Sequence, residues 1–300
     1  MKIAYLIDRD LIGGGMEYVR RQIDAHPNDE CRVFFADCGE CTAANVNAWG
    51  ADAIVVNHLC ALLQLLRNPF GRPKGRVTFV AHGIHWRKYD WMIRECGARS
   101  PRAVPLRLVR FARRMLECWL YRKCDRIVAL TPTDRDDILR LYGRGLRVDV
   151  EPNSLDGWGA QTADSLPAGI DGPFAYLCIG RFDYQKGQDR WIRAIGNRDR
   201  GTGIRETGRT LFIGDGPTLA ACRKLAKELG VEELCVFAGA IPEADRYLKC
   251  ADVVVSPSRW EGMPYLMMKA RALGCRILAT DCPGNRDVLA RYEKWEKLEL

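Results

Sequence analysis

The sequence predicts an α/β protein of two domains, each built around a parallel β-sheet. Two observations support this fold: short apolar runs alternate with helical patterns along the chain, and a stretch rich in Gly, Asp, Ser and Pro separates two such series. The 300 residues, 47% of them hydrophobic, suffice for two cores. We expect a first domain over residues 1–155, a linker over 156–173 and a second domain over 174–300, with the active site in the cleft between the domains.

The strands are expected where apolar runs of strand length occur. In the first domain these runs cover residues 2–7, 32–37, 53–58, 76–82, 126–131 and 146–152. In the second domain they cover residues 174–180, 209–215, 234–240, 252–258 and 276–281. Between the two series, the stretch NSLDGWGAQTADSLPAGIDGP is typical of an interdomain connection.

Composition favours a cytosolic protein. The opening MKIAYLIDRD reaches Asp8 too early for a secretory signal, and no apolar run approaches the ~18 residues of a membrane span. The 13 cysteines are scattered through apolar segments and are an odd number without framework spacing, so we expect reduced thiols in the core. Cys38 and Cys41 form one CxxC pair, but no second pair or nearby His completes a zinc site, and the pair is interpreted as structurally incidental.

Positive charge is concentrated in one segment. From Arg99 to Lys123 there are eight basic residues and one acid, Glu117, so this segment accounts for +7 of the net +8. On a helical wheel the basic side chains of one arc are Arg107, Arg110, Arg113 and Arg114. The opposite arc is apolar and holds Leu108, Phe111, Ala112, Met115 and Trp119.

Two interpretations of this helix stay open. In the first, the arginines are the solvated face of a core helix; in the second, they form a basic amphipathic surface that meets an anionic membrane or an anionic acceptor. Nucleic acid is a weaker third choice, because no aromatic and basic interleaving or known motif supports it.

Three strand-to-loop junctions carry candidate chemistry. The first is DLIGGGMEYVRRQ, where Gly13, Gly14 and Gly15 allow close backbone approach at the start of a helix, although a glycine turn that serves only packing would look the same. The second is CIGRFDYQKGQDRW, which places Arg181 and Lys186 just past a strand. Two cations there can neutralise a diphosphate, and an ordinary cationic turn is the alternative.

The third junction is SPSRWEGMPYLMMKARALG, residues 256–274. Here Glu261 and Gly262 lie on a turn between a strand and a helix, and Pro264 suits a first helical position. Open α/β sheets bind ligands at such turns. An acid beside a helix N-terminus can bind sugar hydroxyls while backbone N–H groups face phosphate, whereas an isolated capping carboxylate would mean little.

Taken in order, these motifs resemble the retaining glycosyltransferases of GT-B fold and family 4. The resemblance runs through GGGME, HGIHW, EPNSLD, GRFDYQKG, FIGDGP, SPSRWEGMP and TDCPGNRDVL, and it covers nearly the whole chain. It implies two Rossmann-like domains whose parallel sheets face each other across a cleft. It also implies a nucleotide-diphosphate sugar (UDP, GDP or ADP type) as donor.

The resemblance implies roles for particular residues. Arg181 and Lys186 would hold the diphosphate, Glu261 would contact the transferred sugar, and His82 would lie near that sugar, unless His82 is structural, since His58 and His85 occupy similar contexts. The remaining donor-binding residues implied are Gly14, Gly15, Gly262, Met263, Pro264 and, with an altered role, Lys269.

No metal or other cofactor is expected. Breaking the anomeric bond leaves negative charge on the nucleoside diphosphate, and fixed cations with a helix N-terminus can stabilise that charge. The competing glycosyltransferase fold uses an Asp-x-Asp metal site, and this chain contains DRD at Asp8–Asp10 and at Asp134–Asp136. The first precedes the glycine turn and the second falls at a probable helix start, so both are interpreted as structural.

The sequence departs from the family pattern at two places. The family has a second Glu eight residues after the first, expected to hold the ribose hydroxyls, and here that position is Lys269. An ammonium donates hydrogen bonds but cannot accept them, so an altered or weaker donor mode is expected. The family also continues beyond NRDVL. Here the second domain looks short, and it is naturally short, truncated, or closed by an amphipathic helix within residues 290–300.

The sequence therefore predicts a metal-independent, retaining glycosyltransferase. It would move a sugar to a hydroxyl of a glycan or glycolipid acceptor, with a leaning by analogy toward lipopolysaccharide or other cell-surface glycans. It would act in the cytoplasm, peripherally at the inner face of the membrane. The alternative is a degenerate sugar-nucleotide-binding or partner-binding protein with the same fold and little turnover, which Lys269 and the short terminus favour.

Overall fold

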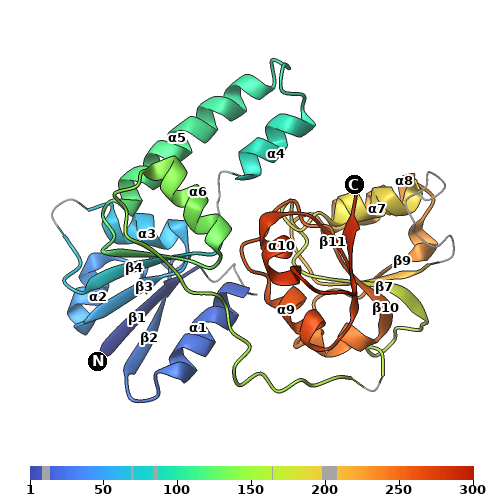
Figure 1. Ribbon diagram of the computed structural model, residues 1–300, viewed down its shortest axis with the longest axis horizontal. Helices are drawn as coiled ribbons and strands as arrows, with labels where there is room; N and C mark the ends of the chain where they lie inside the picture. Colours follow the sequence, from blue (N-terminus) through green and yellow to red (C-terminus); the bar gives the residue numbers. More distant parts are fainter. Residues whose placement is uncertain (9–13, 69–70, 84–86, 164, 198–207) are drawn as a thin grey trace. The chain divides into compact units, whose positions relative to one another are not determined.

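The computed structural model describes residues 1–8, 14–68, 71–83, 87–163, 165–197 and 208–300. They form two compact units, Met1–Asn153 and Ser154–Leu300. Within these described residues each unit contains one six-stranded sheet, and every strand pairing is parallel (Figure 1). The predicted fold class, two α/β domains with parallel sheets, is confirmed.

In the first unit the strands follow apolar runs, as predicted. Across the sheet they are β2 (Glu30–Phe35), β1 (Lys2–Ile7), β3 (Ala53–Val56), β4 (Arg76–Ala81), β5 (Arg126–Ala129) and β6 (Val148–Val150). The helices are α1 (Gly14–Ala25), α2 (Ala43–Trp49), α3 (Leu59–Leu66), α4 (Arg87–Glu95), α5 (Ala103–Tyr121) and α6 (Pro132–Tyr142). The chain order reverses between β1 and β3, because β2 lies on one side of β1 and all later strands lie on the other.

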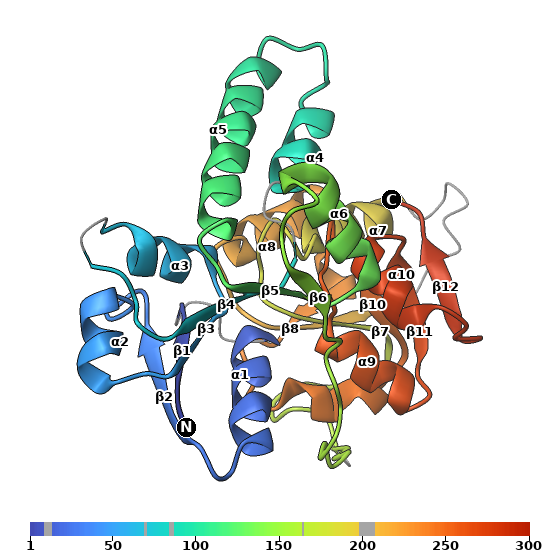
Figure 2. The ribbon, with the colours of Figure 1, turned by 60° about the vertical axis from the view of Figure 1, so that its left-hand side comes forward.

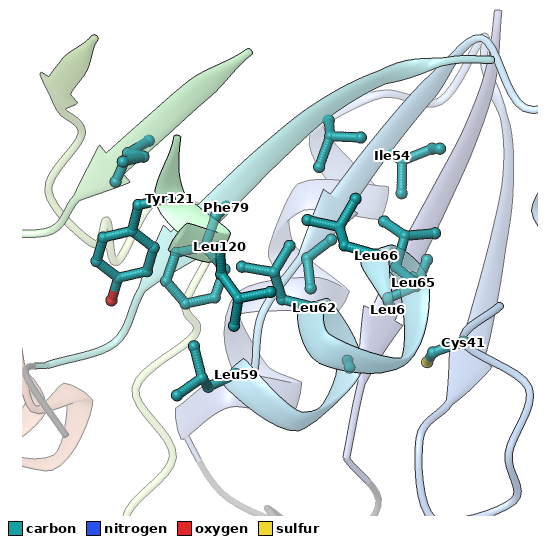
Figure 3. Close-up of a cluster of buried hydrophobic side chains, with 14 of the residues drawn as sticks. Leu6, Cys41, Ile54, Leu59, Leu62, Leu65, Leu66, Phe79, Leu120 and Tyr121 are labelled. Atoms are coloured by element: carbon teal, nitrogen blue, oxygen red, sulfur yellow. The ribbon is translucent and has the colours of Figure 1, made fainter. Parts of the chain in front are cut away.

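The core of this unit forms where α3 and the end of α5 pack on the sheet. Leucines of α3 recur at helical spacing, and Leu62 and Leu65 are fully buried. They lie in one cluster with Phe79 of β4 and Leu120 of α5 (Figure 3). Side chains alternate along β1, so Ala4 and Leu6 belong to this cluster, whereas Tyr5 is buried on the opposite face of the sheet.

The helices α4 and α5 extend away from the sheet as a pair (Figure 2). The base of α4 is held by Arg87, which is paired with Asp134 at 2.9 Å and Asp137 at 2.8 Å on α6. Asp134 lies in the first turn of α6, where Thr131 caps the helix, so the second DRD motif falls at a helix start as predicted. No helix within the described residues has both the length and the apolar character that a bilayer crossing requires.

The second unit has the strand order of a Rossmann sheet. Its strands across the sheet are β12 (Trp295–Leu298), β11 (Arg276–Thr280), β10 (Ala251–Ser256), β7 (Phe174–Ile179), β8 (Thr210–Ile213) and β9 (Cys235–Phe237). Its helices are α7 (Gln188–Gly196), α8 (Leu219–Glu228), α9 (Tyr265–Ala272) and α10 (Pro283–Leu289), with 3₁₀ turns η2 (Glu232–Leu234) and η3 (Ala244–Lys249). Here the chain order reverses between β7 and β10.

Two hydrophobic clusters cover the two faces of this second sheet. Consecutive residues of β7 belong to different clusters: Cys178 packs with Trp191 of α7, and Leu177 packs with Met267 of α9. All 13 cysteines of the chain are free, but the expectation that they are core residues is wrong for Cys38 and Cys60, which are exposed.

The interpretation of the last residues as an amphipathic helix is wrong. Trp295–Leu298 form β12, which pairs in parallel with β11 so that Trp295 lies opposite Ile277. Arg291 adopts a left-handed conformation (φ 64°) after α10, and this turns the chain back along the sheet. Pairing satisfies the backbone groups at the edge of β11, which a short isolated helix would leave exposed.

Candidate functional site

The strongest candidate site lies where the chain order of the second sheet reverses. In open α/β sheets, ligands bind at the carboxyl ends of the strands on either side of such a reversal. The loop after β7 covers residues 180–187 and the loop after β10 covers residues 257–264. Six of the predicted site residues lie on these two loops: Arg181, Lys186, Glu261, Gly262, Met263 and Pro264.

Backbone contacts hold the two loops together. The amide of Arg259 donates to the carbonyl of Gln185 at 2.7 Å, and the Gln185 side chain donates to the carbonyl of Trp260 at 3.1 Å. Gly187 has φ 68°, and a Cβ at this position would lie 2.4 Å from the carbonyl oxygen of Pro257. Only glycine permits this close approach, so the register between the loops depends on it.

Arg259 is a structural residue of the site that the sequence reasoning missed. Its guanidinium is buried and binds both carboxylate oxygens of Asp189 on α7, at 2.8 and 2.7 Å. It also stacks on the ring of Tyr184 at 4.1 Å. Burial alone would raise the pKa of Asp189, but the hydrogen-bonded Arg259 outweighs it and holds that pKa below its usual range.

Lys186 and Glu261, 75 residues apart in sequence, form the centre of the site. The ammonium nitrogen of Lys186 lies 2.8 Å from Oε1 of Glu261, and the hydroxyl of Ser258 donates to the same oxygen at 2.6 Å. Burial alone would lower the pKa of Lys186, but the adjacent Glu261 carboxylate outweighs it and raises that pKa. Lys186 is therefore a fixed positive charge at neutral pH.

A small cavity adjoins this ion pair. It is lined by Lys186, Glu261 and Ser258 together with Gln188, Cys178 and Met267. Ser258 is supported in turn by Thr280, whose hydroxyl donates to the carbonyl of Ser258 at 2.6 Å. Ser258 and Thr280 lie within two of the motifs quoted above, SPSRWEGMP and TDCPGNRDVL. The sequence did not predict a role for either residue.

Arg181 is linked to Lys186 through a shared acid. The Arg181 guanidinium donates to one oxygen of Asp183 at 2.8 Å, and the other oxygen accepts from the Lys186 amide at 2.9 Å. The Arg181 side chain remains about one-third exposed, at 37%. Two cations therefore lie on one short loop, and the side chains of both are partly exposed to solvent.

The predicted backbone contributors Gly262, Met263 and Pro264 lead into α9. Pro264 precedes the first helical residue, and its carbonyl accepts from the amides of Met267 and Met268 at 3.1 and 3.2 Å. Gly284 on α10 packs so tightly against this turn that a Cβ there would lie 2.1 Å from the carbonyl oxygen of Gly262.

Lys269 binds to a different part of the second unit. It lies in the second turn of α9, and its ammonium nitrogen is 3.0 Å from Asp245 of η3 and 5.7 Å from the ring centre of Trp158. The side chain is only 8% exposed. Lys269 therefore joins α9 to η3 and to the stretch that opens the second unit.

A second group of polar residues lies at the strand ends of the first unit. The ring nitrogen Nε2 of His82, after β4, is 3.1 Å from Oδ1 of Asn57, after β3. The Tyr18 ring meets His82 edge-on at 5.1 Å. Burial, with a smaller contribution from nearby His58, lowers the pKa of His82 to about 4. His82 is therefore neutral at neutral pH.

The glycine turn is described in part. Gly14 and Gly15 begin α1, and a Cβ at Gly15 would lie 3.4 Å from the terminal carbon of Ile7, an ordinary van der Waals contact. Gly13 and His85 lie outside the described residues.

One cluster of the first unit offers metal-ligand atoms. Asp8, His58 and Cys60 bring three such atoms within 4.8 Å of one another, and Nδ1 of His58 is 3.5 Å from Asp8. This cluster includes the first acid of the first DRD motif, whereas Asp10 lies outside the described residues. In the second motif Asp134 is paired with Arg87.

The helix α5 exposes its apolar arc. The exposed side chains are Leu108 at 66%, Phe111 at 65%, Met115 at 54% and Trp119 at 45%. The interpretation of α5 as a core helix with a solvated basic face is therefore wrong over this stretch. A helical wheel separates the basic arc of α5 from its apolar arc, but it does not predict which arc the rest of the protein covers.

The four predicted arginines of α5 contact the protein itself. Arg110 is paired with Asp90 of α4, and Arg113 lies 3.8 Å from Glu117. Arg107 donates to the carbonyl of Ala98 at 2.5 Å. Arg114 donates to the carbonyl of Leu141 at 2.8 Å.

Comparison with known families matches most of the second unit. Residues 166–296 match the family model described as Glycosyl transferases group 1. One curated relative, the lipopolysaccharide 1,6-galactosyltransferase of Salmonella typhimurium, is 27% identical over 128 residues, which are 41% of this chain and 34% of the relative. The chain spans at most 40% of the length of the first curated relatives that it matches.

Two solved structures share the fold. Sucrose-phosphate synthase from Thermosynechococcus elongatus superimposes with a TM-score of 0.70 at 18% identity, over 95% of this chain and 82% of that one. Anabaena HepE in complex with UDP and glucose gives a TM-score of 0.66 at 16% identity, with the same coverage. These likenesses show the GT-B fold of two Rossmann-like domains.

Proposed function

We propose that this protein is a glycosyltransferase that takes a sugar from a nucleotide-diphosphate donor without a metal and with retention at the anomeric carbon. The observation that carries the proposal is the Lys186–Glu261 pair, 2.8 Å apart, at the strand reversal of the segment that matches the glycosyl transferase family model. A charged pair at this position offers a cation to phosphate and an acceptor to sugar hydroxyls.

The chemistry of the site suits departure of a diphosphate. As the bond from the sugar to the diphosphate breaks, negative charge grows on the leaving oxygens. Lys186 is a fixed cation, and the partly exposed Arg181 on the same loop adds a second that can reach a phosphate. Because these charges are held in place, they stabilise the transition state without reorganising.

Glu261 is assigned to the transferred sugar. Its Oε1 is already bound by Lys186 and Ser258, which fixes the carboxylate in place. A carboxylate accepts hydrogen bonds from hydroxyls, so it can select and orient the sugar ring. The backbone of Gly262, Met263 and Pro264 leads into α9 and offers amide groups next to it.

UDP-sugars are the first donors to test. HepE, which shares the fold, was solved with UDP and glucose, and this supports starting with UDP-sugars. GDP-sugars come next, because a relative that is 32% identical over 112 residues is named as GDP-mannose-dependent. Lys269 is directed to Asp245, so ribose recognition is assigned to other groups of the second unit.

The acceptor is proposed to be a hydroxyl of a membrane-bound glycolipid, of lipopolysaccharide type. The relative from Salmonella typhimurium acts, by its name, on lipopolysaccharide. The exposed apolar arc of α5 and its basic flank suit the inner face of an anionic membrane, where apolar side chains enter the interface and cations meet lipid phosphates.

Vesicle sedimentation tests this surface. We expect binding to anionic vesicles that weakens at high salt and persists in part, because buried apolar area is not screened. Replacing both Leu108 and Phe111 by Ser should remove the salt-resistant part, whereas the control Leu63→Ser, on α3, should not. Equal recovery with neutral and anionic vesicles would contradict the proposed surface.

A binding protein of the same fold with little turnover is the second candidate. The observation that favours it is Lys269, which occupies the position of the expected ribose-binding Glu and is engaged with Asp245. Binding of nucleotide-sugar without release of free nucleotide would support this second function.

One experiment separates the two. A thermal-shift screen of UDP-, GDP- and ADP-sugars identifies the donor, since a ligand at ~100 times its Kd adds about 2.7 kcal/mol to stability. Nucleotide release is then measured with that donor, with and without EDTA. The proposal expects release that EDTA leaves unchanged. Activity lost in EDTA and restored by manganese would instead indicate a metal, with Asp8 among its first candidate ligands.

A further inference from the structure

The carboxyl ends of β3 and β4 in the first unit hold an uncharged pair that the proposed chemistry does not yet explain, one strand along from the reversal between β1 and β3. Asn57 follows β3 and His82 follows β4, the next strand of the sheet. Because the two strands are parallel neighbours, their carboxyl ends bring both side chains to the same edge. Asn57 is only 3% exposed, which is unusual for an amide side chain without a structural or functional reason.

The orientation of the Asn57 amide follows from its two contacts. Its Nδ2 donates to the carbonyl of Val55, at 3.5 Å, and its Oδ1 faces Nε2 of His82 at 3.1 Å. The flipped amide would place Oδ1 against the Val55 carbonyl, and two acceptors cannot share a hydrogen. The oxygen of Asn57 is therefore the atom that meets the imidazole.

An amide oxygen can only accept, so it selects one form of His82. Nε2 must carry the hydrogen, and in a neutral ring Nδ1 then keeps its lone pair. The ring is neutral because of its burial and the nearby His58, which itself lies 3.5 Å from Asp8. Among the described residues, Tyr18 also contacts His82 and presents its ring edge-on.

We propose that Asn57 is a positioning residue that fixes His82 as the Nε2–H tautomer. Nδ1 is then the hydrogen-bond acceptor that His82 offers to a sugar hydroxyl. This role in transfer rests on the proposed function, in which His82 contacts the transferred sugar. The assignment of the tautomer does not rest on the proposed function, because it follows from contacts within the first unit.

The tautomer can be observed directly by NMR. The chain has 4 histidines, so ¹⁵N-histidine labelling gives few signals, and His82→Gln identifies the signal of His82. In the wild type we expect a protonated Nε2 and an unprotonated Nδ1 throughout the neutral range. An Nδ1–H tautomer in the wild type would overturn the proposal.

Three variants test the role of Asn57. Asn57→Leu removes the acceptor at similar volume, and we expect mixed tautomers. Asn57→Asp places a carboxylate at the same distance, and we expect a higher His82 pKa with the ring charged in mildly acidic solution. Asn45→Leu, at an exposed amide on α2, is the matched control and should leave the His82 signals unchanged. An unchanged tautomer in a folded Asn57→Leu protein would overturn the assignment, and if that variant does not fold, an unchanged His82 pKa in Asn57→Asp would do so.

Kinetics connects the tautomer to transfer. We expect Asn57→Leu to lower kcat by about 10- to 100-fold, as loss of a residue that orients a functional His commonly does. The Kd for free UDP should stay the same, because the diphosphate site is in the second unit. Unchanged kcat would overturn the positioning role. If the wild type binds donor without transfer, the proposed function fails, and the NMR result alone then decides the tautomer assignment.

Discussion

The two units place different chemistry on the same architecture. Both have a six-stranded parallel sheet within the described residues, and in both the chain order reverses between two neighbouring strands. At the reversal of the second unit, Lys186 and Glu261 form a charged pair. In the first unit, Asn57 and His82 form an uncharged pair. The fold supplies the position, and the loop residues decide what can bind there.

This difference assigns different partners to the two edges. Fixed cations favour phosphate oxygens, whereas a neutral imidazole with one acceptor nitrogen favours a hydroxyl group. The charged pair also needs more support, because burying charge costs free energy unless it is compensated. The second unit provides that support with a partly buried ion pair, Arg259–Asp189, which ties the loop after β10 to α7, and Arg259 also donates to the carbonyl of Tyr184 on the loop after β7.

Of the changes considered, replacing Arg259 should cause the largest loss of stability. Arg259→Met removes the ion pair with Asp189. It also removes the hydrogen bond from Arg259 to the carbonyl of Tyr184, on the loop that carries Lys186. We expect a loss of about 3 kcal/mol in the free energy of unfolding of the second unit, as for a broken buried pair. Urea unfolding measures it. Arg276→Met is the control, since its pair with Glu296 is exposed and should contribute less than about 1 kcal/mol. Equal losses in both variants would show that Arg259 does not brace the site.

Acid should weaken the first unit through His82. The folded pKa is about 4 and the ordinary value is 6.5, so between these values the unfolded chain binds more protons and stability rises with pH. The contribution of His82, about 2 to 3 kcal/mol, is fully present above the ordinary value and is lost as the pH falls toward the folded value. Urea unfolding near neutral pH and near pH ~4.5 checks this. His82→Gln should lose less stability on acidification than the wild type, and a parallel loss in both proteins would contradict the pKa.

Lys269→Glu should have the smallest effect of the three. The new carboxylate would face Asp245 in place of an ammonium at 3.0 Å, so we expect a loss of about 1 to 2 kcal/mol in unfolding free energy. Since the side chain is held at η3, the Kd for the donor should change by less than about 2-fold, well under 1 kcal/mol. Lys269→Met removes the ion pair with Asp245 without adding a second carboxylate, so it measures the loss of the pair apart from the repulsion in Lys269→Glu. A clear change in donor affinity, measured by calorimetric titration, would show that Lys269 reaches the ligand.

The sequence predicts the repeating parts of this molecule well. Strand runs such as residues 2–7 coincide with β1, because a buried parallel strand is apolar along its length. β12 was missed, because Trp295–Leu298 lacks such a run and becomes a strand only by pairing with the edge of β11. The exposed arc of α5 was also beyond prediction, since periodicity gives two faces without showing which neighbours cover them.

The candidate site divides in the same way. Motif resemblance singled out Lys186 and Glu261, and local pattern placed both after strands. Their direct contact, and those of Asn57 with His82 and Arg259 with Asp189, join side chains between 25 and 75 residues apart. Such pairs depend on the register of loops packed in three dimensions, which a single sequence does not contain.

In the proposed function, the Lys186–Glu261 pair of the second unit binds a nucleotide-diphosphate sugar without a metal. The most direct measurement is calorimetric titration of UDP-glucose, or of the donor found by thermal shift, in EDTA. The wild type should bind, and Lys186→Met should weaken binding by about 10-fold or more, as loss of a charged hydrogen bond does. Lys227→Met, at an exposed lysine of α8, should bind like the wild type. Equal affinity in the wild type and Lys186→Met would contradict the claim.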